Sequence, residues 1–243
     1  MTRLDRWLVT LGIGSRSQVQ KLVKSGAVQV DGQTVRDPSQ SFVGTEPLTL
    51  HSAPLDGRLT RHVMLHKPAG LLTAARDSKQ PTVMDLLPPA YASLGCMPVG
   101  RLDKDTTGLL LLTTDGELNH RLLAPGRHVD KTYRATVDGP LTADHVAAFA
   151  AGLRLSDFDA QPAALEILSS GDAESVALVT VHEGKFHQIK RMFEAVDRQV
   201  TALHRLTFGS LNLDEALSPG QWRELTAEEL TALYLDAQMK EPL

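Results

Sequence analysis

The chain contains few of the residues on which several protein classes depend. Among its 243 residues there is one cysteine, Cys96, which can form neither an intramolecular disulfide nor a cysteine-based zinc cluster. We expect it to be a small, buried apolar residue. No apolar run is long enough to span a bilayer, and the N-terminus MTRLDRWLVT lacks the apolar core and cleavage site of a secretion signal. These absences predict a soluble protein of the cytoplasm.

The sequence also lacks an excess of positive charge, since its formal net charge is −4. The acidic residues, however, are concentrated at one end of the chain. Residues 211–243 contain two Lys/Arg against seven Asp/Glu, whereas residues 1–60 contain seven against five and residues 183–210 contain five against three. Basic surfaces in these two regions can therefore bind phosphates although the whole chain is acidic.

The first sixty residues have the pattern of a small unit of two helices and a hairpin. Apolar residues at i, i+3, i+4 and i+7 predict a helix that Thr2 caps. A second helix begins near Ser15 to Ser17, and Ser17 and Gln20 have the spacing of a capping box. Two valine-containing runs on either side of Asp31-Gly32 predict a tight hairpin.

A polar stretch at residues 52–61 predicts a linker, after which strands and helices alternate irregularly. Phe186, Ile189 and Phe193 are spaced to share one face of a helix, with Lys190 at the edge of that face. Strands are predicted at residues 63–68, 133–137 and 176–181, and helices at residues 143–151 and 187–196. This order predicts an α+β domain on a mixed, largely antiparallel sheet.

The segment GRLDKDTTGLLLLTTDG, residues 100–116, joins a charged loop to an apolar strand. Its four consecutive leucines lie between turn residues and predict a strand covered on both faces. A loop held at the end of such a strand is a rigid support for catalytic groups. Asp103 and Asp105 can equally be turn residues whose side chains bond to nearby backbone N–H groups. We assign Asp105 to the turn, whereas the local sequence supports a catalytic and a structural role for Asp103 about equally.

Four motifs, in this order, resemble the pseudouridine synthases that modify ribosomal RNA. They are GRLD at 100–103, DKTYRATV at 130–137, EGKFHQIKRMF at 183–193 and LHRLTFG at 203–209. The resemblance is closest to the branch that isomerises a uridine of small-subunit (16S) rRNA. KPAG at 67–70 is similar to that family's entry motif, with His66 in place of the usual asparagine. SRSQVQKLVKSGAVQVDGQTV at 15–35 resembles the alpha-L RNA-binding domain, first known from a small-subunit ribosomal protein.

The resemblance implies an alpha-L RNA-binding domain over residues 1–60 and a catalytic domain over residues 61–243. The catalytic domain would isomerise a uridine without any cofactor. Asp103 would be its catalytic carboxylate, paired with Lys190, because a nearby cation offsets the desolvation of a carboxylate in an apolar pocket. Tyr133 would stack on the target base and assist removal of the proton from C5. Arg101 would occupy the space left by the flipped nucleotide, and Ile189 would pack against the base.

The resemblance leaves the chemical route open at this stage. Asp103 either adds to the sugar or abstracts the 2′ proton to give a glycal, and both routes need an ionised carboxylate beside C1′ and C2′. The histidines His182, His187 and His204 have no spacing typical of a zinc site, so we expect no metal.

Basic residues in both domains are candidates for contacts with RNA phosphates. Each of them has the alternative of being an ordinary solvated charge. In the alpha-L domain the candidates are Arg3, Arg16, Lys21 and Lys24, and around the site they are Lys131, Arg134, His187, Arg191, His204 and Arg205.

We therefore expect a monomeric RNA pseudouridine synthase, an isomerase of rRNA processing and ribosome biogenesis. Its partner would be 16S rRNA in a partly assembled small subunit. Two alternatives remain, an enzyme that acts on 23S rRNA and a non-catalytic RNA-binding ribosome-assembly factor that uses only the N-terminal module. A nucleobase deaminase is excluded, because its zinc site needs cysteine ligands that a single cysteine cannot supply.

Overall fold

The computed structural model describes residues 1–240, which divide into two compact units. The N-terminal unit consists of Met1–Arg61 and Leu87–Met97, and the C-terminal unit consists of His62–Leu86 and the chain from Pro98 onward. The chain therefore enters the second unit, returns once to the first, and then completes the second. None of the described helices is long and apolar enough to cross a membrane.

Three helices and a small sheet form the N-terminal unit. The core between them contains Leu4, Trp7 and Leu8 together with Val19 and Val23, as the helical spacing predicts. The helices are α1 (Leu4–Thr10), α2 (Arg16–Ser25) and the short α3 (Pro89–Ser93). The sheet has the order β3-β2-β5-β6, with β2 (Val28–Val30), β3 (Gln33–Thr34), β5 (Leu48–Leu50) and β6 (Ala53–Leu55), and β1 (Thr2–Arg3) pairs with β4 (Ser41–Phe42).

The turn between β2 and β3 has the conformation that its sequence predicts. Asp31 and Gly32 both have positive φ, of 50° and 74°, as the favoured two-residue hairpin turn requires. The expected hairpin is therefore confirmed.

The helix starts differ from the expectation in detail. Thr2 is not a cap, because it pairs with Phe42 in β1 and β4, and Arg3 precedes α1 without a side-chain cap bond. The capping box of α2 is Ser15 with Gln18, so the Ser17 and Gln20 assignment is wrong. Both pairs have the same three-residue spacing, and the sequence pattern does not distinguish them.

Residues 52–61 are not simply a linker. Their first part forms β6, which extends the sheet by pairing with β5, and the Trp7 indole N–H donates to the Gly57 carbonyl at 2.7 Å. A strand of three residues has no alternation long enough to predict it, and this one is defined by its main-chain pairing with β5.

One mixed sheet forms the C-terminal unit, in the order β13-β14-β10-β15-β9-β7-β18. Only β15 and β9 run parallel, and the other neighbours along this path are antiparallel. The strands are β7 (His62–Lys67), β9 (Thr107–Thr113), β10 (Lys131–Asp138), β13 (Ala164–Ser170), β14 (Glu174–Val181), β15 (Val200–Arg205) and β18 (Trp222–Glu224). The predicted α+β fold on a mixed, largely antiparallel sheet is confirmed.

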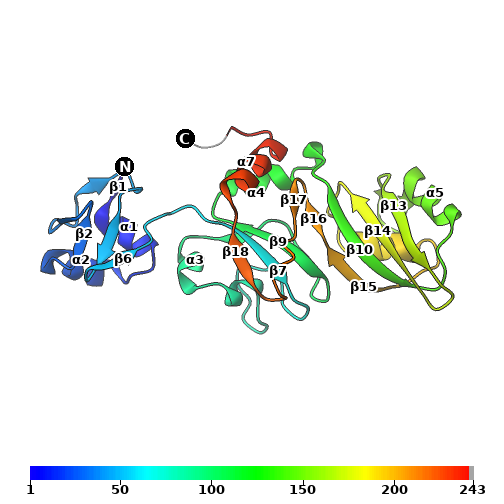
Figure 1. Ribbon diagram of the computed structural model, residues 1–243, viewed down its shortest axis with the longest axis horizontal. Helices are drawn as coiled ribbons and strands as arrows, with labels where there is room; N and C mark the ends of the chain where they lie inside the picture. The colour runs from blue at the N-terminus through cyan, green and yellow to red at the C-terminus, as the bar shows by residue number, and fades with distance from the viewer. Residues whose placement is uncertain (241–243) are drawn as a thin grey trace. The chain divides into compact units, whose positions relative to one another are not determined.

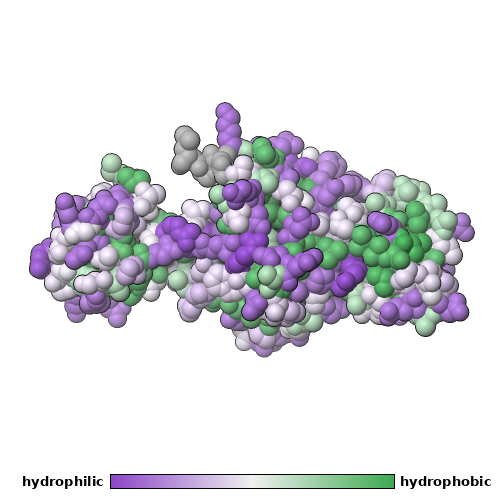
Figure 2. Space-filling view, in the orientation of Figure 1, coloured by the Kyte–Doolittle hydropathy of each residue, from purple (hydrophilic) through white to green (hydrophobic). Residues whose placement is uncertain are grey.

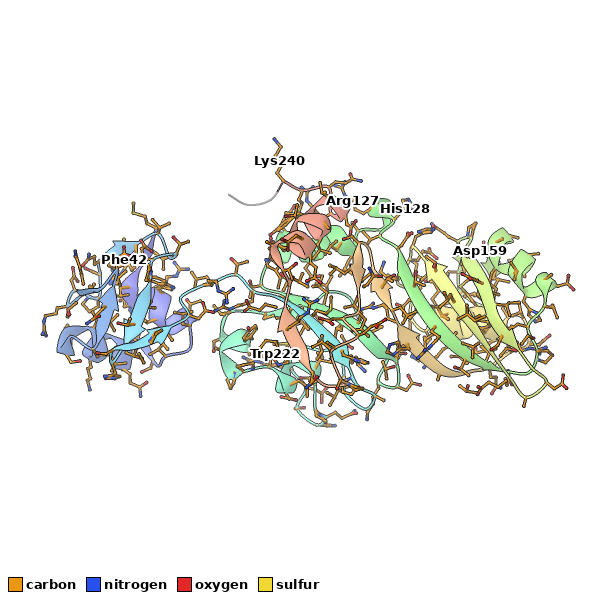
Figure 3. The ribbon with its side chains drawn as sticks, in the orientation of Figure 1. Phe42, Arg127, His128, Asp159, Trp222 and Lys240 are labelled. Atoms are coloured by element: carbon orange, nitrogen blue, oxygen red, sulfur yellow. The ribbon has the colours of Figure 1, made fainter. Side chains whose placement is uncertain are left out.

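Helices cover this sheet and short elements connect its strands. Figure 2 shows apolar surface gathered over β13 and α5. At the other edge of the sheet, Trp222 of β18, labelled in Figure 3, donates its indole N–H to the Leu86 carbonyl at 3.1 Å. The helices are α4 (Gly116–Leu123), α5 (Ala143–Ala151), α6 (Gln188–Glu194) and α7 (Ala227–Asp236), with 3₁₀ turns η1 (Val83–Leu86) and η2 (Pro125–Arg127). The short strands are β8 (Met97–Pro98), β11 (Leu153–Arg154), β12 (Asp159–Ala160), β16 (Thr207–Phe208) and β17 (Leu211–Asn212).

Strand β9 is the centre of the core, and its four leucines are fully buried as predicted. Helices α4 and α7 lie side by side (Figure 1), and their apolar side chains form a cluster with Leu109 and Leu111. Asp115 fixes both helices, because its carboxylate accepts from the Leu118 N–H at 3.0 Å and from the Tyr234 hydroxyl at 2.9 Å. These bonds anchor the C-terminal end of β9 to the two helices.

Gly108 permits the parallel contact between β9 and β15. Its φ is 103°, and a Cβ atom at this position would lie 2.2 Å from the Arg205 carbonyl oxygen. Only glycine fits so close an approach of two backbones at such a φ. The contact brings the loop that precedes β9 next to β15 and β10.

Candidate active site

A pocket in the C-terminal unit is lined by residues that the sequence places far apart. The loop before β9, β10, β14 with its following loop, α6 and β15 all contribute to it. The lining residues are Arg101, Leu102, Asp103, Thr106, Tyr133, Val181, Glu183, Gly184, Lys185, His187, Gln188, Ile189, Lys190 and Leu203. The structure therefore brings together Arg101, Asp103, Tyr133, Ile189 and Lys190, which the sequence analysis had proposed as one site.

The loop of residues 101–106, here the aspartate loop, is held from beneath by Lys67. The Lys67 ammonium is completely buried and donates to the carbonyls of Pro68 at 3.0 Å, Lys104 at 3.2 Å and Thr106 at 2.9 Å. Burial lowers the pKa of Lys67 to about 8, against the opposing effect of the Asp105 and Asp103 charges. Lys67 is therefore still mostly protonated at pH 7 and can make all three bonds.

A second buried side chain fixes the same loop. The Thr73 hydroxyl donates to the Leu102 carbonyl at 2.8 Å and accepts from the Leu102 N–H at 3.2 Å. Asp103 follows directly on this anchored residue. Its carboxylate is thus presented from a backbone that has little freedom to move.

The Asp103 carboxylate, partly exposed to the pocket, has two cationic or titratable neighbours. Lys190 Nζ lies 3.5 Å from one oxygen, and His187 Nε2 lies 3.4 Å from the other. Both partners come from the segment that leads into and forms the start of α6.

Lys190 makes its shorter contacts with a different carboxylate. Its ammonium donates to both oxygens of Asp105, at 2.7 and 2.8 Å, and this contact lowers the pKa of Asp105. The sequence assigns Asp105 to the turn alone. In the structure it also forms an ion pair with Lys190, 85 residues away in the sequence. A local pattern cannot reveal a partner at that separation.

Tyr133 and Ile189 form the apolar side of the pocket. Tyr133 is buried on the same face of β10 as Ala135 and Val137, as the strand alternation predicts. Ile189 is buried at the start of α6. Behind the tyrosine, the Arg205 guanidinium lies 5.9 Å from the ring centroid, with Nη1 3.5 Å from the hydroxyl oxygen.

Two predicted phosphate contacts, Lys131 and Arg205, are wrong. Lys131 is 6% exposed and donates to the Val129 carbonyl at 2.7 Å, and Arg205 is 2% exposed and donates to the Leu109 carbonyl at 2.7 Å. Burial and the nearby Arg205 charge lower the pKa of Lys131 to about 8. The alternation of β10 already carried a signal, because Lys131 has the same parity as the inward-facing Tyr133.

The helix at residues 187–196 is shorter than predicted. Ile189 and Phe193 are buried on one face of α6, but Phe186 lies before the helix and is 70% exposed. His187 has a φ of 51°, a left-handed conformation that separates Phe186 from the helical turn. Phe186 is therefore not part of the shared face.

The remaining basic candidates lie at the surface to different degrees. Arg134, Lys21 and Lys24 are exposed, and His204 is half-buried with its Nδ1 2.8 Å from the Thr107 hydroxyl. Arg191 pairs with Asp157, and its guanidinium lies 4.9 Å from the Phe158 ring centroid.

Arg3 and Arg16 converge on the side chain of Asp5. Arg3 Nη2 lies 3.0 Å and Arg16 Nε 3.4 Å from the same oxygen of this 1%-exposed residue. The hydrogen bond from Arg3, with others from Gln20 and the Arg6 N–H, lowers the pKa of Asp5 to about 2 despite its desolvation. Asp5 thereby holds two arginines together at the surface of the N-terminal unit.

Comparisons with known proteins match two regions of the chain to known families. A family model described as RNA pseudouridylate synthase matches residues 61–195, and a model of the S4 domain matches residues 2–41. An uncharacterized RNA pseudouridine synthase of Bacillus subtilis is 42% identical over 233 residues, covering 95% of this chain and 98% of that protein. The ribosomal small subunit pseudouridine synthase A of Pseudomonas aeruginosa is 43% identical over 237 residues, covering 95% of this chain and all of that protein.

Solved structures include a similar chain as well. A crystal structure of a pseudouridylate synthase superposes with a TM-score of 0.67 at 34% sequence identity, covering 96% of this chain and 100% of the other. The similarity thus extends over both units and not only over the segment that holds the pocket.

Proposed function

The chain belongs to the family of RNA pseudouridine synthases, and we propose that it converts one uridine of 16S rRNA to pseudouridine, with Asp103 as the catalytic carboxylate. The observation that carries the assignment is the pocket itself. It places Asp103, Tyr133 and Lys190 together, although 30 and 57 residues of sequence separate consecutive members. The small-subunit substrate is supported by the similarity to the ribosomal small subunit pseudouridine synthase A of Pseudomonas aeruginosa.

The reaction is an isomerisation, and the chain's own residues supply what it requires. The bond between N1 of the uracil and C1′ breaks, the uracil turns, C5 joins C1′, the proton on C5 is released, and N1 takes up a proton. No atom or electron is gained or lost, so the proposal needs no cofactor. The carboxylate of Asp103 acts beside C1′ and C2′, either by adding to the sugar or by taking the 2′ proton.

The other pocket residues hold the base and the charge. The positive charge of Lys190, 3.5 Å from Asp103, offsets the cost of keeping a carboxylate charged in a partly apolar pocket. Tyr133 and Ile189 pack on the flipped uracil, and the Tyr133 hydroxyl assists proton removal from C5. Arg101, exposed on the aspartate loop, takes the space that the flipped nucleotide leaves in the RNA stack.

Basic residues of both units, among them His187 at the pocket, bind the RNA backbone in this proposal. Arg3, Arg16, Lys21 and Lys24 lie on the S4 domain, and Arg134, His187 and Arg191 lie on the catalytic unit. Phosphate contacts of this kind position the protein without reading sequence. We propose that the enzyme works as a monomer, in the cytoplasm, on 16S rRNA in a partly assembled small subunit.

Tritium release tests the substrate. The full-length protein is incubated with 16S rRNA, 23S rRNA and partly assembled small-subunit particles, all labelled with 5-³H-uridine, and exchange of the C5 proton is counted as released tritium. We expect about one equivalent per 16S molecule, with the Asp103→Asn variant as the blank. Release from 23S rRNA alone would contradict the 16S assignment, and release from no RNA would contradict the proposed activity.

A further inference from the structure

An exposed aromatic ring stands at the rim of the pocket without a role in the proposed chemistry. Phe186 lies in the loop of residues 182–187 between β14 and α6, here the Phe186 loop. Its side chain is 70% exposed, and it is the one aromatic residue among the strongly exposed large apolar side chains of residues 1–240. The residues on either side of it, Lys185 and His187, line the pocket, so the ring is available to stack on a ligand that enters there.

The Phe186 loop is braced from within the protein. The Gln188 amide oxygen accepts from the Lys185 N–H at 3.2 Å, and its NH₂ donates to Glu183 at 2.9 Å. Glu183 in turn accepts from the Gln161 N–H at 3.2 Å. These bonds fix both ends of the short stretch that carries the ring.

One face of the Phe186 ring is already occupied by a second ring. The His187 imidazole stacks on it at a centroid distance of 3.7 Å and an interplanar angle of 19°. His187 holds this place in a left-handed backbone conformation, which costs energy for a residue other than glycine. The stack leaves the outer face of the Phe186 ring to the solvent.

The same histidine connects the ring to the reacting group. His187 Nε2 lies 3.4 Å from Asp103, so one imidazole separates the Phe186 ring from the carboxylate that we assign to catalysis. Arg101 and Lys185, both exposed, line the pocket on the same rim. An RNA strand whose uridine enters the pocket must pass over this rim, where cations can hold its phosphates.

We propose that the outer face of Phe186 stacks on an unpaired nucleobase that flanks the target uridine. The inference rests on the proposed function, because it needs a nucleotide flipped into the pocket. Flipping removes one neighbour from the adjacent base, and an aromatic ring can replace that lost stacking. Stacking accepts any base, because every base has a π face, so this subsite contributes affinity rather than sequence readout. The rim cations favour an RNA strand over an apolar protein surface as the occupant.

The test compares four full-length variants with the wild type, all on the RNA that the wild type modifies. Phe186→Ala removes the ring, Phe186→Trp retains an aromatic face, and Phe186→Leu retains apolar bulk without a π system. Leu235→Ala on α7 is the matched control, because Leu235 is 69% exposed and does not line the pocket. The dissociation constant and the single-turnover rate of tritium release are measured for each, after thermal unfolding has verified that all are folded.

We expect the alanine and leucine variants to bind about 5- to 100-fold more weakly, the loss of one base–aromatic stack, whereas the tryptophan variant and Leu235→Ala stay near the wild type. The ring's partner is then identified with RNAs that carry an abasic site at one of the positions flanking the target. At one such position the abasic RNA should weaken the wild type but cause no further loss with Phe186→Ala.

Three results would overturn the inference. One is equal affinity of Phe186→Ala and the wild type, and another is equal affinity of Phe186→Leu and the wild type. The third is a loss of rate at unchanged affinity with no position-specific coupling, since the ring would then act only through His187. Each presupposes an active wild type. If the wild-type protein released no tritium from any RNA, the proposed function would fail before this inference was reached.

Discussion

At the scale of single residues, the site is organised around one ammonium group that two carboxylates share. Lys190 lies at 2.7 Å from Asp105 and at 3.5 Å from Asp103. The shorter contact holds Lys190 in place, while Asp103 stays partly exposed and lines the pocket. The two carboxylates, which look alike in the sequence LDKD, thus have different surroundings, and their substitution should have different consequences.

Asp103→Asn should abolish turnover, because the amide can neither add to the sugar nor accept a proton. RNA affinity should stay within a few-fold of the wild type, since phosphate contacts lie elsewhere. The matched control is Asp105→Asn, which removes the other carboxylate of the same loop and should retain measurable tritium release at a reduced rate. Turnover near the wild-type rate by Asp103→Asn would show that another group is the catalyst.

At the scale of elements, the position of the aspartate loop depends on the ends of β7 and β9. Lys67, the last residue of β7, bonds three carbonyls around the loop, and Gly108 in β9 permits the close contact with β15. The strands themselves follow from sequence alternation and from the leucine run. The parallel pairing of β9 with β15 does not, because it depends on backbone contact between segments about a hundred residues apart.

Lys67→Met should lower the free energy of unfolding by about 3 kcal/mol, because it removes the three hydrogen bonds that the ammonium group donates, including the one to the Thr106 carbonyl in the buried interior. Urea denaturation of the full-length protein measures this change. Lys104→Met is the control in the same loop, since the Lys104 side chain is exposed and donates to the Gln80 amide oxygen at 2.8 Å. Its free energy of unfolding should change by less than about 0.5 kcal/mol. Equal effects of the two substitutions would contradict the anchoring role of Lys67.

In the N-terminal unit, Asp5 plays the corresponding part by holding Arg3 and Arg16. Its pKa is about 2 in the folded protein, below the ordinary value of 3.8. A carboxyl group with a lowered pKa stabilises the fold above its unfolded pKa, and this contribution is lost as the pH falls from about 4 toward 2.

The difference in stability between the wild type and Asp5→Asn should therefore shrink as the pH is lowered from 5 to 2. Thermal unfolding of both proteins across this range measures it, and subtraction removes the titration of the other carboxyl groups. A difference that stayed constant with pH would mean that the charge of Asp5 does not stabilise the unit.

At the scale of the whole molecule, net charge is a poor guide to the partner. The chain is acidic overall, yet its acidic residues are concentrated after residue 210, and exposed basic residues remain on both units. Contacts with RNA phosphates release counterions, so binding should weaken as salt rises, with a slope that counts those contacts.

The double variant Lys21→Ala/Lys24→Ala should bind rRNA more weakly and reduce the slope of log K against log salt by about two, roughly one for each lost phosphate contact. Lys79→Ala, an exposed lysine outside the S4 domain, is the control and should leave the slope unchanged. Filter binding at several salt concentrations gives both values. An unchanged slope for the double variant would remove the RNA role of α2.

The sequence by itself determined the elements and the residue types of the site. Periodicity placed α1, the hairpin and the buried leucines of β9, and the motif order identified the family. Local spacing also misled, at Ser17 and at Phe186, because neighbouring frames of the same pattern are equivalent until packing selects one.

Only the tertiary structure decided which side chains meet. In the folded chain, Lys190 contacts Asp105 as well as Asp103. Lys131 and Arg205 are buried, and Phe186 is exposed between two residues that line the pocket. Contacts of this kind join segments separated by tens of residues, and they are fixed by the pairing of β9 with β15 and by the direction in which each side chain leaves its strand. The sequence therefore supplies the residue types of this site, and tertiary packing determines which of these side chains are in contact.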